Sequence, residues 1–441
     1  MSQMGAGGES RLEAVPALTG LRFVAAISVV LSHGFEAMAT PPGAEPFWRA
    51  WLIYGSAFGM STFFVLSGFV IHYNYSDSIA EHRWRGVANF FSARFARLYP
   101  LYFVCVFLSL YDYGYFFQLA SGRHPDLDQQ LWQVAPFFLT MTQSWKFSIV
   151  GSNALIYGFP FSNIASISWS ISTELLFYFV YPVILLGLLR FRSARPIVGT
   201  MLGISVVVFG LMFLAYRNLE AINQFGVAHW GAVADMAHGF QDSFVRWLIY
   251  FAPYTRLPEF LLGCLVAALY RQTAERVPSA REERAGLVVA GASIAVIGGI
   301  MWVIARPSNA VPFLQFLHMN FGFALPAATL MFCVARYRNA ITAVLSHPAM
   351  LRCGDASYSI YMLHILIIES AGLNAHNVGQ SGWLTTIVLL RLSLAVLVTI
   401  GFALISYQLV EVPARRWLRR LLTIERRRPA IRAQPRLTGE P

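Results

Sequence analysis

Stretches of about 20 apolar residues recur along almost the whole chain, separated by short polar segments. An α-helix needs this length to cross the hydrocarbon part of a bilayer. Alternating segments of about ten residues, typical of a membrane barrel, are not the pattern here. The sequence therefore predicts an all-α polytopic integral membrane protein with about ten transmembrane helices. The predicted spans are residues 18–38, 54–74, 98–118, 169–189, 197–216, 250–270, 286–305, 316–335, 356–372 and 384–408.

The composition agrees with a membrane protein, because 56% of the 441 residues are hydrophobic and only 12% are charged. No soluble stretch is long enough for a second independent core. We expect an N-terminal segment at 1–17, a membrane domain at 18–422 and a disordered basic tail at 423–441. Two long loops, 119–168 and 217–249, interrupt the membrane domain, and 131–149 is a shorter amphipathic or re-entrant candidate.

Basic residues predict the orientation of the helices. The net charge is +11, and all but one of the 33 basic residues are arginines. If the N-terminus is cytoplasmic, 24 basic residues fall on the inner side and 6 in the outer loops. This asymmetry favours both termini inside and makes the two long loops external. We expect the membrane to be a bacterial cytoplasmic (inner) membrane. It also explains the basic character without nucleic-acid binding.

The cysteines give no sign of a metal site. Cys105, Cys264, Cys333 and Cys353 are scattered along the chain without CxxC spacing. Neither a zinc site nor a disulfide framework is therefore expected.

The first span carries two residues that bilayers penalise, Arg22 and His33. They are eleven residues apart, which places them within about 20° on one helix face and roughly 16 Å apart along the axis. Glu36 follows on nearly the same face. One interpretation is that Arg22 only snorkels to headgroups and that His33 only satisfies a packing hydrogen bond. The functional interpretation is that His33 transfers protons, because histidine titrates near neutrality.

The second and third spans add small residues and paired arginines. Ser67 and Gly68 lie mid-helix in "FFVLSGFVIHYNY", where small side chains let a helix or a ligand approach closely. Arg94 and Arg97 are spaced i, i+3 before the third span and would make a phosphate clamp. Taken alone, these arginines are explained equally by positive-inside anchoring.

Further polar residues fall inside later spans. Glu174, in "SISWSISTELLFYFVYP", needs either a role or an arginine partner. Arg256 and Glu259 are spaced i, i+3, so they either bind substrate or pair with each other. Tyr361 and His364 share a helical face in "GDASYSIYMLH".

Together these stretches resemble the membrane acyltransferase-3 family of O-acyltransferases, in order over about residues 17–416. The matching motifs are L-x-G-L-R before a helix-borne histidine, FF-x-L-S-G-F, R-x-x-R-L-x-P-x-Y, W-S-I-x-x-E-x-x-F-Y, S-Y-S-I-Y-x-x-H and Y-x-x-x-E-x-P, with a weaker match in "RLPEFLLG". One departure is Thr19, where the family commonly has Asp, so Arg22 must find another partner here. No appended esterase-like domain is visible.

The resemblance implies transfer of an acyl group, in the first place acetyl, from cytoplasmic acetyl-CoA to a hydroxyl of a saccharide, glycan or lipid-linked acceptor. The family's functional residues match His33, Arg22, Arg94 and Arg97. We expect the three arginines, with Ser67, to bind the coenzyme.

For the chemical step, His33 would act as a general base or take the acyl group itself, and Glu36 or Glu174 would orient it. Arg256, Glu259, Tyr361 and His364 are the remaining candidates for substrate contacts. No metal is expected, and membrane lipid surrounds the protein.

Other interpretations stay open at this point. Embedded Arg, His and Glu also mark transport paths, so a transporter or flippase is the main alternative, although no internal repeat is found. A related enzyme could transfer succinyl or a longer chain. Ala37-Met38-Ala39 resembles a signal-peptidase site, and cleavage there would remove the first span. The acceptor and the oligomeric state are not fixed by the sequence.

Overall fold

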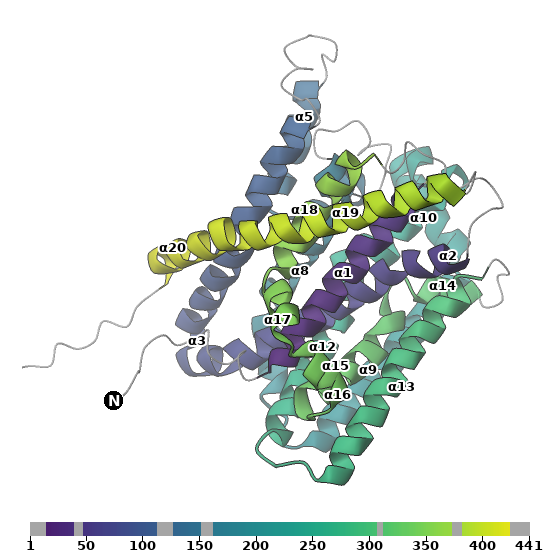
Figure 1. Cartoon of the computed structure of the whole chain (residues 1–441). Helices are drawn as coiled ribbons and strands as arrows, with labels where there is room; N and C mark the ends of the chain where they lie inside the picture. The colour runs from purple at the N-terminus through teal and green to yellow at the C-terminus, as the bar shows by residue number, and fades with distance from the viewer. Residues whose placement is uncertain are drawn as a thin grey trace, which may run out of the picture.

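The computed structural model describes residues 15–38, 47–112, 127–150, 162–306, 312–372 and 382–423. In these ranges every regular element is a helix and none is a strand (Figure 1). Most of the N-terminal segment, parts of the loop 119–168 and nearly all of the basic tail lie outside the described residues. The predicted all-α class is therefore confirmed.

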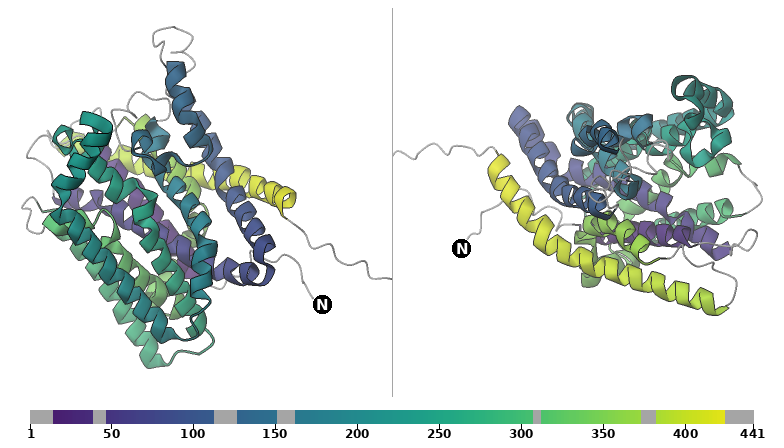
Figure 2. Two further views of the ribbon diagram at one scale, coloured as in Figure 1. Left: turned by 180° about the vertical axis from the view of Figure 1, so that it is seen from behind. Right: turned by 90° about the horizontal axis from the view of Figure 1, so that it is seen from above.

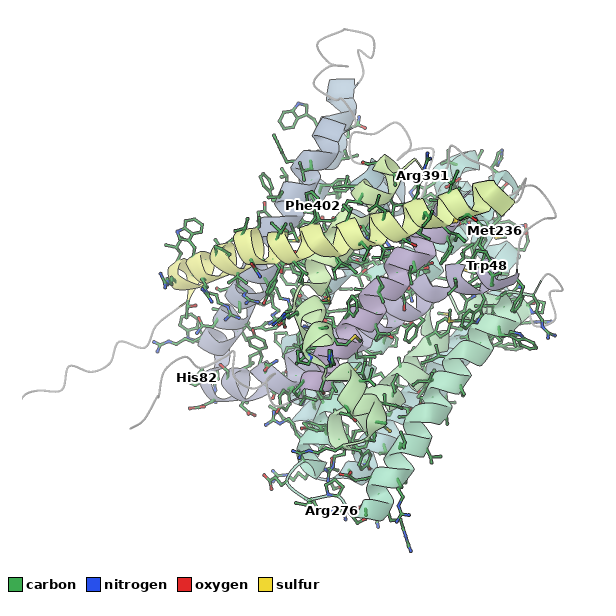
Figure 3. The ribbon with its side chains drawn as sticks, in the orientation of Figure 1. Trp48, His82, Met236, Arg276, Arg391 and Phe402 are labelled. Atoms are coloured by element: carbon green, nitrogen blue, oxygen red, sulfur yellow. The ribbon has the colours of Figure 1, made fainter. Side chains whose placement is uncertain are left out.

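Long helices form the body of the molecule. They are α1 (Pro16–Ala37), α3 (Gly55–Asp112), α8 (Ser162–Leu188), α9 (Ala194–Arg217), α12 (Pro253–Thr273), α13 (Ala280–Ile304) and α19 (Gly382–Ser406). We call the face where α1 begins the near face and the face where α1 ends the far face. Figure 3 shows His82 and Arg276 on the near side of the molecule and Trp48 and Met236 on the far side.

Shorter helices complete the bundle and cover its ends. The helices are α2 (Phe47–Ile53), α5 (Leu127–Leu139), α6 (Phe147–Val150), α10 (Leu219–Trp230), α11 (Phe244–Arg246), α14 (Pro312–Leu317), α15 (Ala324–Arg336), α16 (Ala340–Leu345), α17 (Pro348–Asp355), α18 (Ser357–Ser370) and α20 (Val412–Leu422). Single turns are η2 (Gln143–Trp145), η3 (Gly231–Ala234), η4 (Met236–His238), η5 (Phe240–Asp242) and η7 (Phe321–Phe323), and two π-helical turns are η6 (Trp247–Phe251) and η9 (Tyr407–Glu411). The predicted loop 217–249 is thus a set of short helices.

Six helical stretches of the described chain are long and apolar enough to cross a membrane. One of them, Phe47–Leu108, has 62 residues and contains a bend at Arg83, where φ is 48°. Each of the ten predicted spans overlaps a helix, but the number ten stays a prediction. Large apolar side chains such as Val206 and Leu397 are exposed on the outer surfaces of α9 and α19, as a lipid-facing surface requires.

Helix α1 lies at the centre of the bundle, in contact with α3, α17 and α18. Glycines allow this close packing. A Cβ on Gly20 would stand 1.9 Å from the carbonyl oxygen of Leu345, and one on Gly354 would stand 2.0 Å from that of Thr19. The backbone of α1 therefore touches the backbones of α16 and α17 directly.

The contact between α3 and α12 is equally close and uses a glycine from each helix. A Cβ on Gly68 would stand 2.0 Å from the Phe260 carbonyl oxygen, and one on Gly263 would stand 1.9 Å from that of Val65. The close approach predicted at Gly68 is confirmed, and the partner is a helix. This contact fixes α3, which carries half of the site described below.

Helices α19 and α20 run as one continuous rod through η9 (Figures 1 and 2). The rod crosses in front of α18 and α1 and ends on the near side, where α20 packs against α3. Ser359 of α18 donates a hydrogen bond to the buried carboxylate of Glu411, which ties the rod to the bundle.

We expect Gly263→Leu to lower the stability of the folded protein by about 1–3 kcal/mol or more, because its side chain would meet the backbone of α3. Thermal unfolding of purified protein in detergent measures the effect. Gly203→Leu on α9 is the matched control, since no atom lies within 4 Å of a Cβ there. Equal melting temperatures for the two variants would show that the close contact is not needed.

Candidate functional site

Helix α1 brings its polar residues to two cavities that lie one behind the other. The first lies toward the near face and is called here the arginine cavity. The second lies toward the far face and is called the histidine cavity. Arg22 lines the first and His33 the second, as their shared helix face requires.

The arginine cavity gathers residues from α1, α3, α8 and α18. Its polar lining is Arg22, Ser67, Arg94, Arg97, Ser170, Glu174, Tyr178, Ser357, Tyr358 and Tyr361. All four residues that the sequence assigned to the coenzyme line this cavity, together with Glu174. Helix α3 supplies three of them, because its bend at Arg83 separates Ser67 from the two arginines that follow.

Aromatic hydroxyl groups hold the charged side chains of this cavity in place. Arg94 donates a hydrogen bond of 2.7 Å to the hydroxyl of Tyr75, and its guanidinium lies 4.7 Å from the centre of that ring. Tyr178 donates a hydrogen bond of 2.8 Å to Glu174. Such contacts reduce the rotamer freedom of Arg94 and of Glu174, so both charges are fixed before a ligand binds.

Arg22 has a carboxylate neighbour that the sequence analysis missed. Among acidic groups, Asp355 acts most strongly on the Arg22 charge, followed by Glu174. Asp355 is brought there by Gly354, which packs on the Thr19 carbonyl. Burial raises the pKa of the Asp355 carboxyl, and the charges of Arg22 and Arg97 oppose that rise. Asp355 is therefore an acidic neighbour of Arg22 that a different helix supplies.

The two cavities share Met60 and Tyr361 in their walls. Helix α8 fixes the position of the Tyr361 hydroxyl. This hydroxyl donates a hydrogen bond of 2.7 Å to the Ile167 carbonyl and accepts one of 2.8 Å from Ser170. Only these two side chains are common to both linings. The two cavities therefore adjoin at Met60 and Tyr361.

His33 is hydrogen-bonded to His364, and this pair was not foreseen from the sequence. Nδ1 of His33 lies 2.8 Å from Nε2 of His364, and the two rings are parallel to within 7°. Nδ1 of His364 lies 2.5 Å from the Tyr361 carbonyl oxygen. That oxygen can only accept, so His364 carries its proton on Nδ1. In the neutral pair His33 then donates from Nδ1, and its Nε2 keeps a free lone pair.

The two candidate carboxylates take different positions. Glu36 lines the histidine cavity beside His33, and its charge acts favourably on protonated His33. Glu174 lines the arginine cavity and bonds Tyr178. Neither bonds Nδ1 of His33, because His364 occupies that position. The predicted role of Glu36 or Glu174 in orienting His33 stays a prediction, and the group that bonds Nδ1 of His33 is another histidine.

Arg256 and Glu259 pair with each other one layer behind the cavity wall. Both are buried, with Nη1 of Arg256 3.3 Å from the carboxylate of Glu259. Arg256 also donates to the carbonyls of Tyr250 at 2.9 Å and Met319 at 2.5 Å. Tyr250 and Met319 line the histidine cavity, whereas Arg256 and Glu259 line neither cavity. The Arg256–Glu259 pair is therefore placed to stabilise the wall of the histidine cavity and not to contact a ligand.

The histidine cavity combines aromatic and polar side chains. Trp169, Tyr54, Tyr250, Phe240 and Phe251 supply rings, and Glu36, Gln241, Arg246, Gln315 and His318 supply hydrogen-bonding groups. The sequence placed Arg246 only in an outer loop, and no local pattern marked it. In the structure its guanidinium lies 4.9 Å from the Phe251 ring and donates to the Gln241 carbonyl at 2.9 Å. This mixture suits a ligand with hydroxyl groups and apolar faces.

No cluster of metal-binding side chains occurs among the residues that the structure describes. All four cysteines lie within that part of the chain and are unpaired.

Comparison with known proteins agrees with this arrangement. The chain is 26% identical over 437 residues to acyltransferase MdmB of Streptomyces mycarofaciens, which covers 98% of this chain and 97% of that protein. It is 24% identical over 409 residues to O-acetyltransferase OatA of Staphylococcus aureus. That alignment covers 91% of this chain but only 57% of OatA, so the chain spans little more than half of that relative. No solved structure matches it. The family model Acyl_transf_3, described as an acyltransferase domain, matches residues 15–407. The chain therefore belongs to the acyltransferase family that this model describes.

Proposed function

We propose that this protein is an integral-membrane O-acyltransferase that moves an acyl group, in the first place acetyl, from acyl-CoA to a hydroxyl of a saccharide or lipid-linked acceptor. The observation that carries the proposal is the pair of adjoining cavities, one lined by three arginines and the other by His33. The first suits the anionic donor and the second suits a hydroxylated acceptor.

The donor would enter from the near face. Its phosphates would meet Arg22, Arg94 and Arg97, because guanidinium groups bind phosphate oxygens in pairs. Arg22 and His33 are roughly 16 Å apart by helix geometry, and a pantetheine arm of about 15–20 Å spans that distance. The thioester would then lie near Met60 and Tyr361, within reach of His33.

The chemical step follows from the tautomer of His33. Its Nε2 takes the proton of the acceptor hydroxyl as the oxygen attacks the thioester carbonyl carbon. The carbon–sulfur bond breaks, the thiolate leaves, and the proton passes from Nε2 to that sulfur. While His33 is doubly protonated, its Nδ1–H remains bonded to His364, and Glu36 favours the positive charge. His364 is in this scheme a positioning residue.

The orientation in the membrane is part of the proposal. The arginine-rich segments, such as the bend after His82 and the start of α13, lie on the near face, which favours a cytoplasmic near face and cytoplasmic termini. Acyl-CoA would then come from the cytoplasm, and the acceptor would reach the histidine cavity from outside a bacterial inner membrane.

A ligand screen separates this proposal from transport and from other acyl chains. We expect acetyl-CoA and free CoA to raise the melting temperature of the purified protein, because a ligand that binds only the folded state stabilises it. If succinyl-CoA raises the melting temperature more than acetyl-CoA does, the transferred group is succinyl and not acetyl. If no CoA compound has any effect, a transporter with the same two cavities is the better explanation.

Replacing the proposed base tests the chemistry. We expect His33→Ala to reduce acyl transfer from labelled acetyl-CoA by about 10²–10⁴-fold, because general-base catalysis is lost. Protein amount and melting temperature should stay near wild type. The exposed His229 of α10 supplies the control variant His229→Ala, which should keep full activity. If His33→Ala transfers acyl groups at the wild-type rate, His33 does not take part in the reaction. If an acylated His33 is trapped in the absence of acceptor, the mechanism is an acyl relay and not base catalysis.

The positioning role of His364 is tested by two substitutions. His364→Gln keeps an acceptor near Nε2, whereas His364→Leu removes it. We expect the leucine variant to lose kcat by about tenfold or more at unchanged KM for acetyl-CoA, with partial recovery in the glutamine variant. A purely structural histidine would instead give equal losses in both variants, together with lowered melting temperatures.

A further inference from the structure

One histidine in the wall of the histidine cavity has no part in the reaction described above. His318 directly follows α14, and its backbone amide donates to the Leu314 carbonyl at 3.0 Å, so it continues the turn of that helix. It is half-buried and lines the cavity together with Gln315, which lies one turn earlier on the same side. The same cavity contains His33. A ligand that reaches His33 therefore also lies within the walls that include His318.

Buried polar groups hold the chain that carries His318. Arg256 of α12 donates to the carbonyl of Met319. The side chain of the buried Asn320 donates to the carbonyl of Ile249 at 2.7 Å. The two residues that follow His318 are thus tied to α12 and to η6, which fixes the backbone at this point of the wall.

The ring of His318 is oriented by an aromatic contact. It packs edge-to-face against Tyr54 of α3, with 5.0 Å between the ring centres and 86° between the planes. This is a preferred geometry for two rings, and it restricts rotation of the imidazole. The imidazole therefore has a defined position before a ligand binds.

The two ring nitrogens of His318 have different surroundings. Nδ1 is buried beside the carbonyls of Leu314 and Gln315, although no well-aligned hydrogen bond forms there. A carbonyl oxygen can only accept, so the neutral imidazole carries its proton on Nδ1. Because Nδ1 is buried, Nε2 is the nitrogen that a ligand in the cavity can reach. Nε2 then offers a lone pair to a hydrogen-bond donor.

The proposed reaction limits which donor can meet this lone pair. Nε2 of His33 takes the proton of the hydroxyl that is acylated. A hydroxyl group has a single proton, so the same hydroxyl cannot also donate to His318. The donor must therefore be another group of the acceptor, and the remaining hydroxyls of a saccharide supply such groups.

We propose that Nε2 of His318 accepts a hydrogen bond from a second hydroxyl of the acceptor, an inference that rests on the saccharide acceptor proposed above. His318 is then a substrate-binding residue that selects acceptors with at least two hydroxyls, one of which meets His33. An acceptor without the second hydroxyl leaves Nε2 of His318 without a donor in the occupied cavity, and this lowers kcat/KM.

The test uses the methyl glycosides of glucose, galactose and mannose as acceptors, with labelled acetyl-CoA and the full-length protein in detergent. The best acceptor is compared with its monodeoxy derivatives, each of which lacks one hydroxyl. For the wild type we expect one derivative to give no product, because the acylated hydroxyl is absent, and another to lose kcat/KM about tenfold or more. In His318→Leu the parent acceptor should fall to the level of that second derivative, and the derivative itself should react as it does with the wild type.

Three further variants separate recognition from folding. His318→Phe keeps a ring against Tyr54 and should behave as the leucine variant does, so it replaces that variant if the latter does not fold. His318→Gln keeps an acceptor near Nε2 and should retain most of the preference for the parent acceptor. His229→Leu removes an exposed imidazole from α10 and, as the matched control, should retain the full preference.

Two results would contradict the proposed contact. A wild-type preference for the parent acceptor in both His318→Leu and His318→Phe would overturn this inference alone and leave the acyltransferase proposal intact. If the wild type acylates none of the three glycosides although acetyl-CoA raises its melting temperature, the saccharide acceptor is wrong, and the role of His318 falls with it.

Discussion

The structure depends on one constraint, which is the cost of enclosing charged side chains in an apolar helix bundle. Charged side chains inside the bundle lie beside acidic or polar groups. Arg22 of α1 has Asp355 of α17 and Glu174 of α8 as acidic neighbours, Arg94 bonds Tyr75 across the bend of α3, and Arg256 pairs with Glu259 within α12. The neighbours of Arg22 therefore favour the packing of α1 against α8 and α17, whereas the other two pairs act within α3 and within α12. Close packing through Gly20, Gly68, Gly263 and Gly354 brings the partners into range.

Tyr361 links the two halves of the site. Its ring belongs to the wall of both cavities, its hydroxyl is tied to α8, and its backbone carbonyl accepts the proton of His364. The position of this one residue therefore affects both cavities and the tautomer of the histidine pair. In the proposed reaction the acyl carbon meets the base at this point.

Much of the site was predictable, and the failures have a common cause. Helical periodicity placed Arg22 and His33 on one face, and small residues predicted a close contact at Gly68. The order of the motifs along the chain predicted the acyltransferase family, and the match of the family model over residues 15–407 confirms it. The contact between His33 and His364 could not be predicted, since 331 residues separate them. Asp355 was not predicted as an acidic neighbour of Arg22, and the sequence left open whether Arg256 and Glu259 face a ligand or each other.

The sequence by itself determined what is local. The length of each apolar run, the face on which a side chain lies and the arrangement of arginines along the chain follow from helix geometry and from the cost of burying charge. Only the tertiary structure decided which polar groups meet, because hydrogen bonds between helices depend on packing that no single segment contains. The proton on Nδ1 of His33 is the clearest case. It follows from the carbonyl of Tyr361 acting through His364, and neither residue is near His33 in the sequence.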